Sequence, residues 1–156
     1  MKYNYFPKTK DELENLINQL IEERGINADL NDIDTSKVTN MCELFYRSEF
    51  NGDISKWDVS NVTNMSDMFC CSNFNGDISN WNVSKVKDMS GMFKDSIFNR
   101  DISNWNVSSV GNMSCMFEDS EFDGDISKWG VSRLAYMNCM FEGCLLEDNE
   151  PDWYRG

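Results

Sequence analysis

Phe50-Asn-Gly-Asp-Ile-Ser-Lys-Trp57 opens a unit of 24 residues that returns almost unchanged from Phe74, Phe98 and Phe122. The four copies align without insertion or deletion. A fixed period of this length is typical of repeat proteins, whose units are too small to bury an apolar face alone and form a core only against their neighbours. Three columns of identical residues result: Trp57, Trp81, Trp105 and Trp129; Met65, Met89, Met113 and Met137; Phe69, Phe93, Phe117 and Phe141.

The spacing within one unit predicts a short strand followed by a short helix. Ile54, Trp57 and Val59 have the apolar spacing with which leucine-rich repeats turn a loop into a strand. Val62 to Phe69 places apolar residues at i, i+3, i+6 and i+7, which is one face of a helix. The expected fold is therefore an α/β solenoid, leucine-rich-repeat-like, with the Trp and Met columns inside.

The repeat weakens at both ends of the chain. Ile26 begins a degenerate first coil, and the pattern is lost after Leu146. Before the repeat, Thr9 and Glu12 form a capping-box pair and Gly25 supplies a C-terminal stop, which predicts a helix between them. We expect a capping segment and helix at 1–25, about five coils at 26–145, and a degenerate half repeat that caps the end at 146–156.

Composition narrows the possible functions. The 156 residues include no His and carry a net charge of −13. The missing imidazole excludes Ser-His-Asp and Cys-His catalysis and His-bearing zinc sites. The negative charge argues against binding to nucleic acid or to an anionic membrane, because either surface would repel it. No segment reaches the ~18–20 apolar residues that cross a bilayer, so no membrane insertion is expected, and the N-terminus has no apolar run of signal-peptide length.

An aspartate returns at one slot of every unit: Asp29, Asp53, Asp77, Asp101 and Asp125. The expected role is to accept backbone N–H groups in its own turn. The alternative is calcium held between turns, with Asp29 to Asp34 and Asp123-Gly-Asp125 as candidate clusters, although neither matches an EF-hand loop. The sequence therefore predicts no metal-ligand residue and no cofactor.

The six cysteines do not form a recognisable framework. No Cys-x-x-Cys pair occurs, which disfavours zinc ribbons and thioredoxin-like sites. Free thiols suit a reducing compartment. Cys115 and Cys139 share one repeat slot, so a bridge between them stays open as an alternative.

The repeated words at 50–57 and 74–81, and Trp-x-Val-Ser-x-Val-x-x-Met-x-x-Met-Phe at 57–69, 81–93 and 105–117, resemble the BspA-like leucine-rich-repeat family. More narrowly, they resemble its Mycoplasma-type repeat of unknown function. The resemblance implies a bacterial, protist or viral protein, often displayed at a cell surface and associated with adhesion. The sequence itself points to a cytoplasmic or virion-associated chain. The resemblance carries no catalytic residues.

The expected function is a non-enzymatic protein-interaction module, for adhesion or as an adaptor, that is monomeric and binds a protein partner. The candidate contact surface is the polar face of the predicted strands. A site that needs one particular shape should lie where the repeats differ, which includes the turns after each Phe69-type residue. The face is formed by Asp34, Asp58, Asn82 and Asn106, with Lys56, Asn80, Asn104 and Lys128 beside them.

Two other function classes stay open. An acidic decoy that mimics nucleic acid would need continuous negative charge, and the coil at 74–97 is neutral, with 3 basic and 3 acidic residues. An enzyme acting on polysaccharide would use paired carboxylates and exposed Trp. Equivalent carboxylates suit that chemistry poorly, because catalysis needs two groups with separated pKa values.

Overall fold

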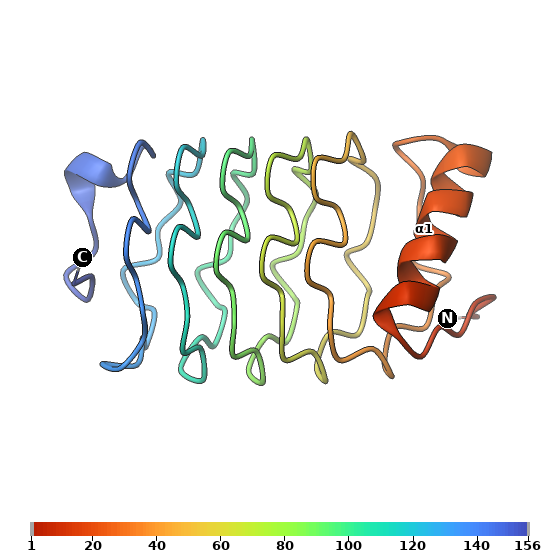
Figure 1. The fold of residues 1–156 in the computed structure, drawn as a ribbon, viewed down its shortest axis with the longest axis horizontal. Coiled ribbons are helices and arrows are strands. Elements are labelled where there is room, and N and C mark those ends of the chain that lie inside the picture. Colours follow the sequence, from red (N-terminus) through yellow and green to blue (C-terminus); the bar gives the residue numbers. More distant parts are fainter. Residues whose placement is uncertain (1, 156) are drawn as a thin grey trace.

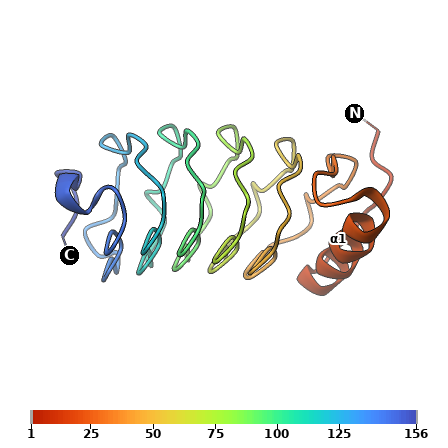
Figure 2. The ribbon, with the colours of Figure 1, turned by 90° about the horizontal axis from the view of Figure 1, so that it is seen from above.

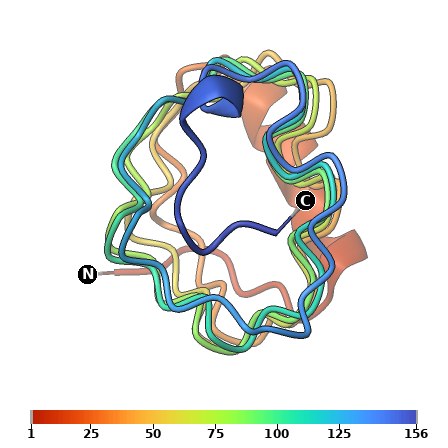
Figure 3. The same cartoon turned by 90° about the vertical axis from the view of Figure 1, so that its left-hand side faces the viewer.

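The computed structural model describes residues 2–155 as a row of similar coils stacked along one axis (Figure 1). Each coil is one 24-residue unit, and the coils superpose when viewed along the row (Figure 3). The N-terminal helix closes one end and the C-terminal segment closes the other (Figure 2). Equivalent residues of successive units therefore lie next to one another, as the period predicts.

Helix α1, Lys10–Arg24, lies at the N-terminal end and has both predicted end signals. The Thr9 side chain accepts the N–H of Glu12, and the Glu12 carboxylate accepts the N–H of Lys8. Gly25 follows the helix at φ 88°, a value that favours glycine. The buried face of α1 consists of Leu13, Ile17 and Leu20. This helix is the part of the secondary structure that was predicted correctly.

The prediction of an α/β solenoid with leucine-rich-repeat-like units was wrong. Within residues 2–155 the helices are α1 and one 3-10 turn, η1 at Glu147–Asn149. No unit contains a strand or helix of its own, and β structure in the described residues is limited to isolated parallel bridges. The coils are built from consecutive turns, so the labels solenoid and leucine-rich repeat do not describe this chain.

Most of the segment predicted as a helix, 62–69, belongs instead to the wall of each coil that pairs most closely with its neighbours. We call 64–72 and its equivalents the ladder wall; the equivalents are 40–48, 88–96, 112–120 and 136–144. The N–H groups of Met65, Asp67 and Phe69 donate to carbonyls of the next coil at 2.8–3.0 Å. Residues between them close turns within their own coil, as in Met68 N–H to Met65 C=O. The backbone N–H groups of the ladder wall thus donate alternately to the next coil and to a turn within their own coil.

The helix prediction failed because two residues of each ladder wall have left-handed backbone. Asp67 lies at φ 52° and Cys71 at φ 55°, and the equivalent residues of the other coils are also positive. A right-handed helix excludes such angles. Tight turns closed between residues i and i+3 give the same apolar spacing as one helical face, so the spacing alone cannot separate the two structures.

The opposite wall begins with the Asn-Gly-Asp motif, which was predicted to be a bend, and continues into the segment from Ile54 to Val59 that was predicted to be the strand. We call 50–57 and its equivalents the NGD wall; the equivalents are 26–33, 74–81, 98–105 and 122–129. Between coils, backbone pairing on this wall is confined to the first two, where the Asp53 N–H donates to Ala28 C=O at 3.0 Å and the Leu30 N–H donates to Asp53 C=O at 2.9 Å. The N–H groups of Asp77, Asp101 and Asp125 donate to no protein group within residues 2–155.

Indole groups join the coils where the backbone of the NGD wall does not. The Nε1–H of Trp81 donates to Ile54 C=O of the preceding coil at 3.2 Å, and each Trp from 57 to 153 repeats this bond. Trp57 and Trp81 stack with their ring planes 1° apart. The predicted burial of the Trp and Met columns is confirmed, since Trp57, Trp81, Trp105 and Trp129 are at most 4% exposed and Met65, Met89 and Met113 are fully buried.

The stack is wider on the NGD wall than on the ladder wall. The ring centroids of Trp57 and Trp81 are 6.5 Å apart, whereas those of Phe69 and Phe93, beside the ladder wall, are 5.7 Å apart. Backbone hydrogen bonds draw the ladder wall together, and the NGD wall lacks them beyond the first pair of coils. The NGD wall therefore opens into a hollow between each pair of later coils.

Candidate binding surface on the NGD wall

A row of carboxylates runs along the NGD wall, each held in its own turn. One oxygen of Asp77 accepts the N–H of Ser79 at 2.9 Å, and the other members of the row make the equivalent bond, which confirms the predicted role. Hydrogen bonds from the hydroxyl and N–H of Ser103 hold the pKa of Asp101 below its usual value. Ser127 lowers the pKa of Asp125 in the same way. The lowered pKa favours the ionised form of both Asp101 and Asp125.

A second row, of asparagines, replaces backbone pairing between the later coils. The N–H of Asn75 donates to the side-chain oxygen of Asn51 at 2.8 Å, and the N–H of Asn99 donates to that of Asn75 at 3.0 Å. The Asn99 amide also donates to an Asp123 carboxylate oxygen at 2.8 Å. Hydrogen bonds that involve side chains, and not backbone N–H to C=O pairs, thus hold this wall, which leaves polar hollows between its coils.

Arg100 breaks the uniformity of the wall. It occupies the slot that holds Gly52, Gly76 and Gly124 in other coils. Its Nε–H donates to Asn75 C=O of the preceding coil at 2.8 Å, and the residue as a whole is exposed. No carboxylate within residues 2–155 forms an ion pair with it.

The hollow beside Arg100 contains charges of both signs in a volume of about 520 Å³. Bases and acids from two neighbouring coils line it together with polar uncharged groups. We call it the Arg100 hollow. Its lining consists of Asn99, Arg100, Asp101, Ser103, Asn104, Asp123, Gly124, Asp125 and Lys128.

Two of the predicted contact residues, Asn104 and Lys128, line the Arg100 hollow. Lys56 and Asn80 occupy the same slot in earlier coils and lie outside it. All four side chains are exposed. The predicted lysine and asparagine row is therefore brought together only in part.

The other predicted contact row comes one residue after the end of the NGD wall in each coil, and none of its members lines the hollow. Asp34, Asp58, Asn82 and Asn106 each accept the N–H of the serine two residues later, at 3.0–3.2 Å. Asp34 is half-buried and the others are exposed. The structure thus places these residues as turn-forming groups at the margin of the NGD wall.

The sequence-based prediction missed Arg100, Asp101 and Asp125. The aspartates of Asn-Gly-Asp were interpreted as turn-forming groups, with calcium binding as the alternative, and not as contacts for a protein partner. The available signal was Arg100 itself, a large base in a slot that otherwise holds glycine or alanine. A break in an exact repeat marks a position where the core does not dictate the residue.

The thiols are unpaired in the structure. Burial raises the pKa of Cys70 and of Cys115 to about 12, which keeps both protonated at neutral pH and weakens them as nucleophiles. Within residues 2–155 no three His, Cys, Asp or Glu side chains gather in a way that would hold a metal ion. Over the same residues, no helix is long and apolar enough to cross a membrane.

A family model described as a Mycoplasma protein of unknown function, DUF285, matches residues 12–97 and again 94–153. The chain belongs to this family. The match confirms the Mycoplasma-type part of the resemblance and carries no leucine-rich-repeat label. No curated protein and no solved structure matches the chain.

Proposed function

We propose that this member of the family is a non-enzymatic protein-interaction module, and that the Arg100 hollow is the centre of its contact surface. The observation that carries the proposal is the replacement of glycine by Arg100 on a wall whose other coils are nearly uniform. A uniform wall offers the same contacts in every register along the stack. One residue that departs from it supplies a fixed point of recognition.

The charges of the hollow favour binding over catalysis. Asp101 and Asp125 are held by equivalent serines and both have a lowered pKa. General acid–base catalysis needs one group that keeps its proton and one that has lost it. Two carboxylates in the same state lack that difference, whereas they pair well with lysine or arginine of a partner.

Arg100→Gly tests the proposal with little risk to the fold, because glycine occupies the same slot in three other coils. We expect it to weaken capture of a protein partner from producer or host lysate roughly tenfold or more, the effect of losing one charge-assisted hydrogen bond of ~1.5–3 kcal/mol. Arg133→Ser is the matched control. It also removes one arginine and restores a residue found in the same slot, Ser109.

The comparison of the two variants decides the outcome. Partner capture that Arg133→Ser leaves intact and Arg100→Gly weakens supports the assignment. Equal capture by the wild type and Arg100→Gly would show that the hollow is not the contact surface.

A further inference from the structure

Summed over the five coils, the turns that join the two walls carry a net positive charge, opposite in sign to that of the whole chain. The turn begins at the slot of Asp58, which is acidic in the first two coils. Its other outward positions are those of Asn61 and Thr63 and their equivalents in the other four coils. None of these ten positions is acidic, in a chain with 27 Asp and Glu residues. We call this side of the stack the basic edge. Its bases are Lys37, Lys85, Lys87 and Arg133.

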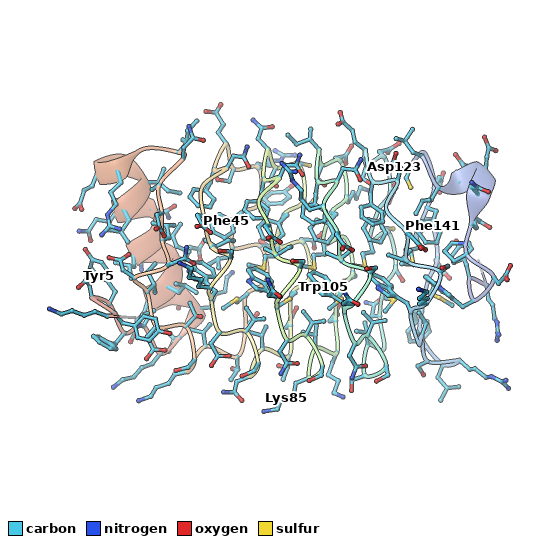
Figure 4. All side chains as sticks on the ribbon, turned by 180° about the vertical axis from the view of Figure 1, so that it is seen from behind. Tyr5, Phe45, Lys85, Trp105, Asp123 and Phe141 are labelled. Carbon is cyan, nitrogen blue, oxygen red and sulfur yellow. The ribbon has the colours of Figure 1, made fainter. Side chains whose placement is uncertain are left out.

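The bases of this edge are exposed and regularly placed. Lys37, Lys85 and Arg133 occupy one slot in every second coil. Lys85 reaches along the edge to the side-chain oxygen of Asn61 at 2.7 Å and points away from the core (Figure 4). Within residues 2–155 none of the edge bases forms an ion pair. Their charges are therefore available to an outside partner.

Large apolar side chains are exposed at the C-terminal end of the same edge. Leu134 is 88% exposed, although it occupies the slot in which Val62, Val86 and Val110 are fully buried. The cause is a turn that closes one residue later than in the other coils, through Ala135 N–H to Ser132 C=O. Tyr136, two residues on, is 69% exposed.

The N-terminal end of the edge has a similar composition. Phe6 is 63% exposed and lines a small hollow with Pro7, Lys8 and Lys37. Asp34 is the acid at this point, and one of its oxygens is engaged by the Ser36 N–H. Exposed apolar groups thus flank the row of bases at both ends.

We propose that the basic edge docks this protein, edge on, onto an anionic lipid surface, with Leu134 and Tyr136 entering the headgroup region. Bases near an anionic leaflet and exposed apolar side chains beside them are the two features by which proteins bind at a membrane interface without crossing it. Tyrosine is favoured at that depth because its ring is apolar and its hydroxyl polar.

The net charge of −13 does not prevent this orientation. Electrostatic interaction decays over about 8 Å at physiological ionic strength, so a lipid surface interacts mainly with the edge that faces it. The acids in the neighbouring slots are Asp34, Asp58 and Asp88, and one oxygen of each accepts the N–H of the serine two residues later. Nucleic acid fits the edge less well, since it offers no apolar layer for an exposed leucine.

Vesicle sedimentation of the full chain tests the proposal. Vesicles of phosphatidylcholine alone are compared with vesicles of equimolar phosphatidylcholine and phosphatidylglycerol. We expect binding to the anionic vesicles only. The double variant Lys85→Gln/Lys87→Gln should lower the partition coefficient about 30-fold, the loss expected for two bases near such a surface.

Two further variants separate lipid docking from simple charge attraction. Lys10→Gln/Lys94→Gln removes the same charge elsewhere on the surface and should leave vesicle binding close to that of the wild type. Leu134→Ser/Tyr136→Ser leaves the charge unchanged and should weaken binding to vesicles. Circular dichroism confirms that each variant retains the wild-type fold before binding is compared.

Three results would overturn the proposal. The first is that the wild type binds both kinds of vesicle equally or binds neither kind. The second is that the two double lysine variants lose the same amount of vesicle binding. The third is tight binding to duplex DNA that Leu134→Ser/Tyr136→Ser leaves unchanged. The Arg100→Gly variant should bind vesicles normally, so failure here and failure of the proposed protein contact are separate results.

Discussion

The two long walls of each coil contain equally regular sequence words but are joined to their neighbours in different ways. On the ladder wall, every second residue donates its backbone N–H to the next coil, as Met89 and Phe93 do. On the NGD wall beyond the first pair of coils, indole and asparagine side chains make the connections. Regular sequence therefore gives regular position, while the chemistry of the linkage depends on local backbone conformation.

The difference also explains where polar surface is available. A wall whose backbone groups are paired presents only side chains. The NGD wall presents N–H groups, such as that of Asp101, that no protein group within residues 2–155 accepts, and they lie beside ionised carboxylates. The distance between neighbouring coils changes along the NGD wall, as its glycines show. A Cβ at Gly52 would lie 2.1 Å from Ala28 C=O, whereas one at Gly76 would lie 3.2 Å from Gly52 C=O. The coils thus separate after the first pair.

Loss of one indole should have the largest effect, because the Trp column is the main connection on the NGD wall. Trp105→Ala removes a side chain that is 3% exposed together with its hydrogen bond to Ile78 C=O. We expect unfolding free energy, measured in urea, to fall by about 3–5 kcal/mol. Trp153→Ala, at the half-buried end of the column, should cost clearly less. Equal costs would mean that the column does not hold the wall.

Backbone conformation on the ladder wall should give the next effect. Gly91 lies at φ 60°, and Gly91→Ala should lower stability by about 1–2 kcal/mol because an L-residue is disfavoured there. A Cβ would also meet a carboxylate oxygen of Asp67 at 2.1 Å. Gly111→Ala is the control, since its Cβ would meet only Lys87 C=O at 3.7 Å. A ladder wall with helical backbone would instead gain stability from Gly91→Ala.

The sequence was sufficient for everything that depends on period and least informative about backbone angles. Repetition at 24 residues predicted the buried Trp and Met columns, and capping residues predicted α1. The strand and helix inside each unit were wrong, because apolar spacing in Val62 to Phe69 fits a helix and a series of tight turns equally well. The left-handed slots of Asp67 and Cys71 hold glycine in only one coil each, at Gly91 and Gly143, and these two glycines were the available signal.

Only part of the candidate site was predicted, again because the sequence does not show the local backbone conformation. Asn104 and Lys128 were chosen as exposed polar residues beside the Trp, and both line the Arg100 hollow. The hollow itself exists because backbone pairing between these coils is missing. No residue type in the sequence predicts that missing pairing. Asp101 and Asp125, predicted from the sequence as turn-forming groups, therefore became candidate contacts for a protein only once the two coils were seen side by side.

The third effect is smaller: replacing a single carboxylate should change the pH dependence of stability in opposite directions on the two walls. Burial, and then the charges of Glu43 and Asp88, raise the pKa of Asp67 on the ladder wall, so its ionised form opposes folding. Asp67→Asn should raise stability at neutral pH by about 0.5 kcal/mol, allowing for its partial exposure to solvent. The gain should vanish as pH falls through the raised pKa toward the ordinary value of 3.8.

Asp77 on the NGD wall should behave in the opposite way. The Ser79 N–H and hydroxyl lower its pKa, so its contribution to stability is present above pH 3.8 and is lost as pH falls through the lowered value. Asp77→Asn should therefore reduce stability slightly at neutral pH and make no difference in strong acid. Urea midpoints across this range measure both variants, and the same sign of change for the two would contradict the assignment.

Amide hydrogen exchange of the full chain tests the contrast between the walls most directly. The N–H groups of Met89 and Phe93, paired between coils, and that of Asp53, paired with Ala28, should exchange slowly. Those of Asp77 and Asp101 should exchange much faster, because no protein group accepts them within residues 2–155. Protection of Asp77 and Asp101 equal to that of Asp53 would show that the NGD wall is a paired sheet along its whole length and would contradict the account.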